Sequence, residues 1–353
     1  MSVFFWLLVL LAVRSAAVNK DGFYSDYIGR SGIQPIKGIF ILLVFISHFV
    51  QYVTLGGVWD APYFDVRRFL GQMVVVPFLF YSGYGMAESI RAKGTAYVRR
   101  MPVHRICKVL FQFGIAVILF LILQYSRGVR YEWSRILLSF IGWYSVGNSN
   151  WYIFAIVCMY LITWLSYTLC RRGKLMPLLC ATVLTAVYIV VMKLVKGQEV
   201  WCNTVAAYLA GMWFSAYREK FDRTVLSRNR DYYIYLVLIA AAFVFLRQYW
   251  SRLLVYEAVS VLFALLVVMI TAKVQISSRF LTYCGEHLFS LFILQRIPMI
   301  ALDNTAIEQY PWLYLLVCVG LTFLMCGVFD NLTQMAWDGL MGLTKKNQTV
   351  PPL

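Results

Sequence analysis

Long apolar stretches alternate with short polar segments along the whole chain. A helix needs roughly 20 mostly apolar residues to cross a hydrocarbon core about 30 Å thick. We predict ten such spans, at about 36–55, 69–87, 107–126, 151–170, 175–195, 201–217, 232–247, 253–272, 287–302 and 311–330. The segments between them are too short for a soluble domain. The pattern therefore predicts an all-α, polytopic membrane helix bundle with about ten transmembrane helices plus a short N-terminal apolar segment.

The same pattern predicts the domain organisation. Residues 1–30 form an N-terminal apolar segment and lead-in, residues 31–335 a single transmembrane domain, and residues 336–353 a cytoplasmic tail. Residues 1–18 suit a short span or an interfacial helix, and less well a cleaved signal, because no positively charged region precedes the apolar run. Amphipathic segments at 135–146 and 331–343 are expected to be interfacial or re-entrant.

The composition excludes a soluble enzyme. Apolar residues make up 61% of the chain and charged residues 14%, whereas soluble domains contain about half and about a quarter. The 8 cysteines are scattered singly with no Cys-x-x-Cys, and most lie in apolar runs. We interpret them as buried small hydrophobic residues rather than as disulfides or zinc ligands, so no metal site is predicted.

The net charge of +16 suggests an acidic partner such as nucleic acid until the charges are placed on the topology. If the first main span runs outwards from the cytoplasm, 21 of the 32 Lys and Arg, including Arg171 and Arg172, lie in one set of loops and nine in the other. The positive-inside rule assigns the richer set to the cytoplasm. Topology thus explains most of the excess charge, and we expect a lipid bilayer and no nucleic acid as partner.

His48 is the most informative residue, because an ionisable group within a membrane span is costly and is a functional candidate. Lys37 precedes it by eleven positions, which is the same helix face about 16 Å nearer the cytoplasm. The face also carries Gln51, with Tyr52 one turn beyond His48. One interpretation is a neutral imidazole acting as general base or nucleophile in a tunnel from the cytoplasm. The alternative is a histidine that only hydrogen-bonds a neighbouring span.

A basic segment leads into the third predicted span. Arg105, Lys108 and Gln112 are at i, i+3 and i+7, so we expect them on one helix face at the cytoplasmic end. Guanidinium forks with an ammonium charge suit a polyphosphate ligand. Arg99 and Arg100 are further candidates, although anchoring to lipid headgroups is the preferred interpretation for this pair.

Several other polar positions are weaker candidates. The run Ser82-Gly83-Tyr84-Gly85 suits close helix packing, or backbone exposed to a ligand, and packing is the preferred interpretation. The predicted substrate pocket is lined by Gln51, Tyr52, Ser82, Tyr84, Gln112 and Trp151. His104 is expected to be solvated or interfacial, and His287 to cap the start of a span or to lie at headgroup level; no chemical role is predicted for either.

These motifs resemble, in order and spacing, the acyltransferase-3 family of integral-membrane O-acyltransferases of bacteria. Lys37 to His48 is similar to the basic-x10-His signature, residues 76–86 to the second-span stretch Pro-Phe-Phe-Phe-x-x-Ser-Gly-(Phe/Tyr), and Arg105 to Lys108 to the third-span Arg-x-x-Arg. Trp151-Tyr152-Ile153 also fits, and the resemblance covers residues 25 to 335. Lys108 departs from the second arginine, and Gln295 stands where many members have a histidine.

The resemblance implies transfer of an acyl group, with acetyl expected, from cytoplasmic acyl-CoA to a hydroxyl of an extracytoplasmic or lipid-linked carbohydrate. His48 would be the base or a transient acyl carrier, and Lys37, Arg105 and Lys108 would hold the CoA phosphates. The expected location is the inner or plasma membrane of a bacterium. The competing class is a transporter or flippase for a lipid-linked sugar or small anion, in which His48 and Arg296 relay protons or bind substrate. A third is a membrane subunit that anchors partners.

Overall fold

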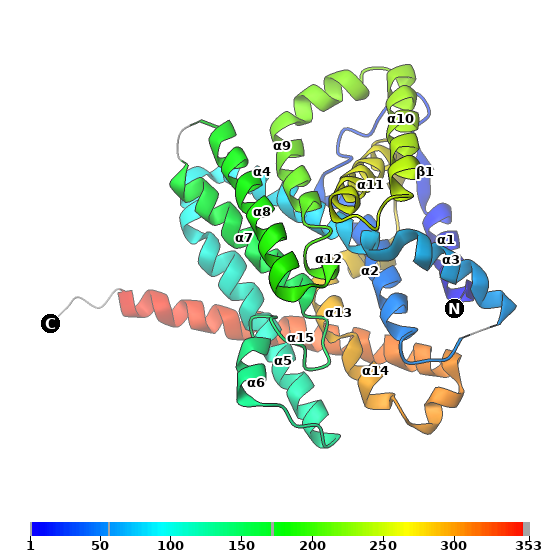
Figure 1. Ribbon diagram of the computed structural model, residues 1–353, viewed down its shortest axis with the longest axis vertical. Helices are drawn as coiled ribbons and strands as arrows, with labels where there is room; N and C mark the ends of the chain where they lie inside the picture. The colour runs from blue at the N-terminus through cyan, green and yellow to red at the C-terminus, as the bar shows by residue number, and fades with distance from the viewer. Residues whose placement is uncertain (1, 56, 171–172, 349–353) are drawn as a thin grey trace. The chain divides into compact units, whose positions relative to one another are not determined.

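The structure is a computed structural model that describes residues 2–55, 57–170 and 173–348, without the side chains of residues 59 and 343–348 (Figure 1). Arg171 and Arg172 of the predicted cytoplasmic set, and residues 349–353 of the predicted tail, lie outside the described residues. The chain divides into two compact units. Unit 1 comprises Met1–Ser47, Leu55–Ile106 and Trp151–Glu286, and unit 2 comprises His48–Thr54, Cys107–Asn150 and His287–Leu353.

Unit 1 holds most of the long helices. Its elements are α1 (Ser2–Arg14), β1 (Ala16–Val18), most of α2 (Arg30–Phe49), η1 (Val58–Asp60), α3 (Ala61–Leu70), η2 (Gly71–Val75), α4 (Val76–Met101), most of the π-helix Pro102–Cys107, α7 (Trp151–Leu169), α8 (Leu175–Lys196), η4 (Glu199–Trp201), α9 (Ala206–Val225), α10 (Asn229–Arg247), α11 (Leu253–Lys273), β2 (Val274–Ile276) and α12 (Arg279–Glu286). Helix α4 packs along α9, α7 lies beside α8, and α10 lies beside α11 (Figure 1).

Unit 2 is built around one long helix. Its elements are the end of α2, α5 (Lys108–Ser126), α6 (Trp133–Ser139), α13 (Leu288–Leu294), α14 (Arg296–Leu302), η5 (Ala306–Gln309) and α15 (Pro311–Gln348). Helices α13 and α14 pack against both α15 and α5. Helix α15 continues without a break through residues 331–343, so the re-entrant alternative for this segment is wrong, and its interfacial position stays a prediction. With 38 residues it extends about 57 Å, well beyond the thickness of a hydrocarbon core.

Seven helical segments of the described chain are long and apolar enough to cross a membrane. They support a multi-pass membrane protein, but the predicted count of ten is not confirmed. The predicted spans 69–87 and 107–126 fall in one continuous helical run, Ala61–Ser126. The span expected at 201–217 corresponds to α9, which carries charged residues in its second half, and the span at 287–302 is divided into the short helices α13 and α14.

Two short strands modify the all-α prediction. Strands β1 and β2 pair antiparallel, with Ala16 opposite Ile276, and three residues each are too few to show an alternating pattern in the sequence. The buried Lys273 at the end of α11 stabilises this region, because its ammonium group donates to Asn229 Oδ1 at 2.6 Å and to the Asn19 carbonyl at 3.1 Å. Helix α1, with 13 residues, extends about 20 Å, which favours the interfacial alternative over a complete span.

Two glycines allow α4 and α9 to approach each other closely. A Cβ atom at Gly83 would lie 1.9 Å from the Tyr208 carbonyl oxygen, and one at Gly211 would lie 2.0 Å from the Phe80 carbonyl oxygen. Both obstacles are backbone atoms, so a side-chain rotation cannot relieve them. The geometry agrees with the packing interpretation of the Ser82-Gly83-Tyr84-Gly85 run.

We expect Gly83→Ala to lower the free energy of unfolding by about 2 kcal/mol or more, because the helices must separate to accept the methyl group. Gly85→Ala is the matched control on the same helix, since a Cβ there meets nothing within 4 Å. Alanine at that position should be neutral, or stabilising by up to about 1 kcal/mol. Thermal unfolding of the two variants in detergent checks this, and equal melting temperatures would contradict the packing account.

Candidate active site

The predicted site residues fall into two sets, one in each unit. Unit 1 contains the set Lys37, Ser82, Tyr84, Arg99, Arg100, Arg105 and Trp151, and unit 2 contains His48, Gln51, Tyr52, Lys108 and Gln112. Each set has its own hydrogen-bond partners. Lys37 and His48 both belong to helix α2, as predicted.

The main feature of the first set is a basic pocket of about 350 Å³ in unit 1. Lys93, Arg100, His104 and Arg105 bring nitrogen groups to its wall, and Tyr97 contributes a phenol. Arg105 donates from Nε to the Tyr97 hydroxyl at 2.9 Å, which orients the guanidinium group. Arg99 is not among the lining residues, so of the predicted pair only Arg100 faces this pocket.

Lys37 and Arg105 both belong to unit 1. Arg30 and, more weakly, Arg105 are the positive charges that act on the half-buried Lys37 ammonium group, which also lies 5.9 Å from the centre of the Tyr81 ring. In the part of the chain that the structure describes, no carboxylate forms an ion pair with either residue. Two cations that act on each other and have no paired carboxylate favour an anionic ligand, because like charges repel until a counter-charge binds.

The local helix geometry around Arg105 differs from the prediction. Residues Pro102–Cys107 form a π-helix between α4 and α5, so Arg105, Lys108 and Gln112 do not follow the expected α-helical face. Pro102 has no backbone N–H to donate to the preceding turn, and such a gap favours a local π-type arrangement. The basic loop expected before the third span is also helical, with a break at Gly94 where φ is 59°.

Tyr84 and Ser82 take part in contacts within unit 1. The Tyr84 hydroxyl accepts from Arg218 Nη1 at 2.9 Å, and Tyr27 donates to Asp222 Oδ1 at 2.6 Å in the same network. Burial, reinforced by that bond to the Asp222 carboxylate, raises the pKa of the Tyr27 phenol well above its ordinary value, so it remains a donor. The Ser82 hydroxyl hydrogen-bonds the Tyr160 side chain.

Trp151, the last predicted residue of unit 1, begins α7. Its indole is half-buried and packs edge-on against the Tyr152 ring, with the ring centres 5.9 Å apart. This contact within its own helix gives Trp151 a packing role at the start of α7. Its place in the substrate pocket stays a prediction.

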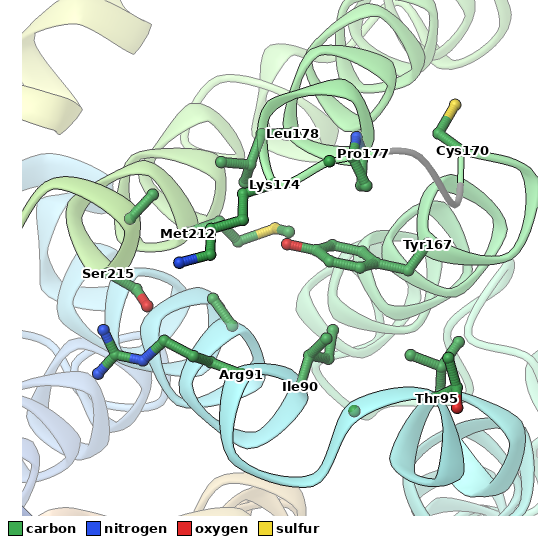
Figure 2. Close-up of a pocket in the computed structure, with 15 residues that line it drawn as sticks. Ile90, Arg91, Thr95, Tyr167, Cys170, Lys174, Pro177, Leu178, Met212 and Ser215 are labelled. Carbon is green, nitrogen blue, oxygen red and sulfur yellow. The ribbon is translucent and has the colours of Figure 1, made fainter.

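A second pocket of unit 1, about 300 Å³ in volume, contains none of the predicted site residues. Figure 2 shows Arg91 and Lys174 at its edge, with Tyr167 and Met212 extending into it. Arg91 is paired with Glu88 at 2.5 Å, so its charge is already compensated. The basic pocket around Arg105 is therefore the better candidate for an anion.

In unit 2, His48 lies in the last turn of α2 and is half-buried. Its Nε2 atom is 3.4 Å from Ser149 Oγ, and its ring packs 6.2 Å, centre to centre, from the ring of Phe292. The helix ends at Phe49, where β-branched Val50 and Val53 follow, so Gln51 and Tyr52 do not continue the predicted helix face. Gln51 is exposed, and the Tyr52 hydroxyl accepts from Arg296 Nε at 3.0 Å.

The loop that presents Ser149 to His48 is held by its own hydrogen bonds. Asn148 Oδ1 accepts from the Val146 N–H at 3.0 Å, and Ser145 donates to the Asn148 carbonyl at 2.7 Å. Gly147 has φ 106°, a conformation that side chains disfavour, and a Cβ there would lie 2.7 Å from Gln124 Nε2. A rigid loop of this kind fixes the hydroxyl beside the imidazole ring.

The comparison with protein families joins these observations to an activity. The family model described as an acyltransferase domain, that of the acyltransferase-3 family, matches residues 30–330. The chain belongs to the acyltransferase-3 family. Comparisons with curated proteins and with solved structures gave no match. The resemblance deduced from the motifs is thus confirmed, and the chain is a multi-pass membrane acyltransferase.

As a member of the acyltransferase-3 family, the chain keeps the cationic character of the third-span motif, with Lys108 in place of the second arginine. Lys108 hydrogen-bonds Gln334 at 2.7 Å, and Gln112 hydrogen-bonds Thr333 at 3.2 Å, both on α15 of unit 2. Gln295, in place of the histidine of many members, is buried and donates to the Phe292 carbonyl at 3.1 Å. Among the described residues, no group of three or more His, Cys, Asp or Glu side chains could hold a metal ion.

Several residues beside the predicted site residues of this acyltransferase were not predicted from its sequence. Tyr97 and His104 of the basic pocket, and Ser149 beside His48, were not identified, although the small polar run at residues 145–150 was a visible signal. His287 was expected at the membrane surface without a role, but its Nδ1 atom lies 2.5 Å from Asp330 Oδ2. Consecutive antiparallel spans bring such ends together, so the predicted topology contained this signal as well.

Proposed function

We propose that this acyltransferase moves an acyl group, with acetyl expected, from cytoplasmic acyl-CoA to a hydroxyl of an extracytoplasmic or lipid-linked carbohydrate in the inner membrane of a bacterium. The observation that carries the proposal is that Lys37 and Arg105, whose positive charges act on each other, form no ion pair with a carboxylate among the described residues of a chain of the acyltransferase-3 family. Two cations without a carboxylate suit the phosphates of CoA, which are the most highly charged part of an acyl donor.

In this proposal the basic pocket of unit 1 binds the donor. Arg105, oriented by Tyr97, provides a planar fork for phosphate oxygens, and Arg100 and His104 add charge or hydrogen-bond donors at the wall. Lys37 supplies a point charge from α2. Lys108 of α5 in unit 2, which hydrogen-bonds Gln334, keeps its predicted role toward the CoA phosphates.

His48 provides the chemical group. As a general base, the neutral ring takes the proton of the acceptor hydroxyl. The hydroxyl oxygen attacks the thioester carbonyl, and the C–S bond breaks. As an acyl carrier, a ring nitrogen attacks the thioester carbonyl and the C–S bond breaks to release CoA thiolate. The sugar hydroxyl then attacks the acyl-imidazole, the acyl–nitrogen bond breaks, and the hydroxyl proton passes to the freed ring nitrogen. Ser149, 3.4 Å from Nε2, orients the ring in either case. Gln51, Tyr52, Ser82, Tyr84, Gln112 and Trp151 remain the predicted acceptor-side residues.

The test is to incubate the purified protein with acetyl-CoA labelled in the acetyl group and with a panel of oligosaccharides. We expect release of CoA thiol and a labelled, alkali-labile ester on a carbohydrate. A burst of CoA thiol formed without an acceptor, equal in amount to the protein, would identify the acyl-carrier route, and its absence the general-base route. Intact acetyl-CoA, together with transport of an unchanged sugar into vesicles, would contradict the proposal.

A further inference from the structure

A second imidazole of unit 2 is built into a hydrogen-bonded cluster. His287, just before α13, donates from Nδ1 to Asp330 Oδ2 on α15 at 2.5 Å. Ser290 donates to the same carboxylate oxygen at 2.9 Å. The side chains of His287 and Asp330 are half-buried, and Ser290 is buried. The carboxylate therefore fixes the orientation of the ring.

The cluster is continuous with the residues assigned to the acyl donor in unit 2. Thr333, one turn after Asp330 on α15, accepts from Gln112, and its hydroxyl also contacts the Asp330 carbonyl at 3.5 Å. Gln334 follows and accepts from Lys108 at 2.7 Å. Asp330, the partner of His287, thus lies within about one turn of α15 from the residues that hydrogen-bond Lys108 and Gln112 of α5.

The short helix α13, which follows His287 directly, also contacts His48. Phe292 on α13 packs against the His48 ring, and His287 precedes it by five residues, about 7.5 Å along a helix axis. The two imidazoles have different partners. His48 lies beside a neutral hydroxyl, whereas His287 lies beside a carboxylate that compensates the positive charge of a ring holding two protons.

We propose that His287 is a second catalytic histidine, which protonates the leaving CoA thiolate. This inference rests on the proposed function. When the acyl C–S bond breaks, its electron pair goes to sulfur, and the Nε2–H of the doubly protonated His287 gives its proton to form the CoA thiol. The hydroxyl proton taken up by His48 balances the one that His287 loses, so the net reaction converts acyl-CoA and an alcohol into an ester and CoA thiol. Asp330 and Ser290 are positioning residues.

The proposal is tested by changing the leaving group. A thioester of an acidic thiol, such as S-acetyl 4-nitrothiophenol, expels a stable thiolate and needs no proton donor. We expect His287→Gln to lower kcat/KM about 100-fold with acetyl-CoA but only a few-fold with the acidic thioester. Asp330→Asn should follow the same pattern with a smaller loss, because the ring remains but loses its orientation.

Asp303→Asn is the matched control, since it removes another carboxylate of unit 2 that is paired with a cation, Arg127 at 3.4 Å. This substitution should leave kcat/KM unchanged with both acyl donors. Activity of His287→Gln with the acidic thioester reports that the variant is folded. Equal losses with both donors, or no loss with either, would overturn the role of His287. Absence of turnover in the unaltered protein would instead overturn the proposed function, and the donor role of His287 with it.

Discussion

Replacing His48 by alanine is expected to lower the rate of acyl transfer about 10³-fold, because the variant has neither a base nor an acyl carrier for the hydroxyl. The residue is half-buried at the end of α2, so its replacement exposes little new surface and the fold should persist. Steady-state rates of CoA thiol release and of ester formation, measured with labelled acetyl-CoA, check the expectation.

His48→Gln separates chemistry from structure. A glutamine amide can hydrogen-bond Ser149, as the imidazole does at 3.4 Å, but it cannot take a proton or form an acyl intermediate. If His48 only links two helices, the glutamine variant keeps its activity. In our account it is as inactive as the alanine variant. Ser149→Ala should lower the rate of acyl transfer about tenfold, because the imidazole ring remains and only its orientation is less restricted.

The second large effect is expected at the donor pocket. Arg105→Ala should weaken acyl-CoA binding about 10- to 100-fold, since a hydrogen bond to a charged group contributes about 1.5–3 kcal/mol. Arg105→Lys should recover part of this loss, because the charge returns without the planar fork. Calorimetric titration with acetyl-CoA measures both variants.

A truncated donor tests whether the phosphates are the groups recognised. Acetyl-pantetheine carries no phosphate, so Arg105→Ala should cost it little compared with acetyl-CoA. Arg91→Ala is the control, because Arg91 lies in the other pocket of unit 1 and is paired with Glu88. An equal loss of affinity for both donors in Arg105→Ala would contradict phosphate recognition.

Hydrophobic periodicity predicted several spans closely. The helices α5, α7, α8 and α11 begin and end within two residues of the predicted limits. In these segments the ends of a long apolar run set the ends of the helix. Spans with charges or interruptions were predicted less well. Helix α9 carries a charged second half, and Gln295 separates α13 from α14, so neither segment has a continuous apolar helix of full length.

The candidate site was predicted in part, for a similar reason. Lys37, Arg105 and His48 stood out because charged groups near apolar runs are rare, and in the structure the charge of Arg105 acts on Lys37. Their partners depend on tertiary contacts. Tyr97, Ser149 and Asp330 are ordinary polar residues in the sequence. Only the structure shows that they contact Arg105, His48 and His287, respectively. The π-helix after Pro102 likewise alters a helical face that spacing alone suggested.

The central claim is His48-dependent transfer of an acyl group from acyl-CoA on one side of the membrane to a carbohydrate on the other. The most direct measurement uses sealed vesicles containing the protein, with labelled acetyl-CoA outside and an oligosaccharide enclosed. We predict a labelled ester on the enclosed oligosaccharide in vesicles with the unaltered protein and none with His48→Gln. Acetyl-CoA that remains intact, or the same amount of ester with His48→Gln, would contradict the account.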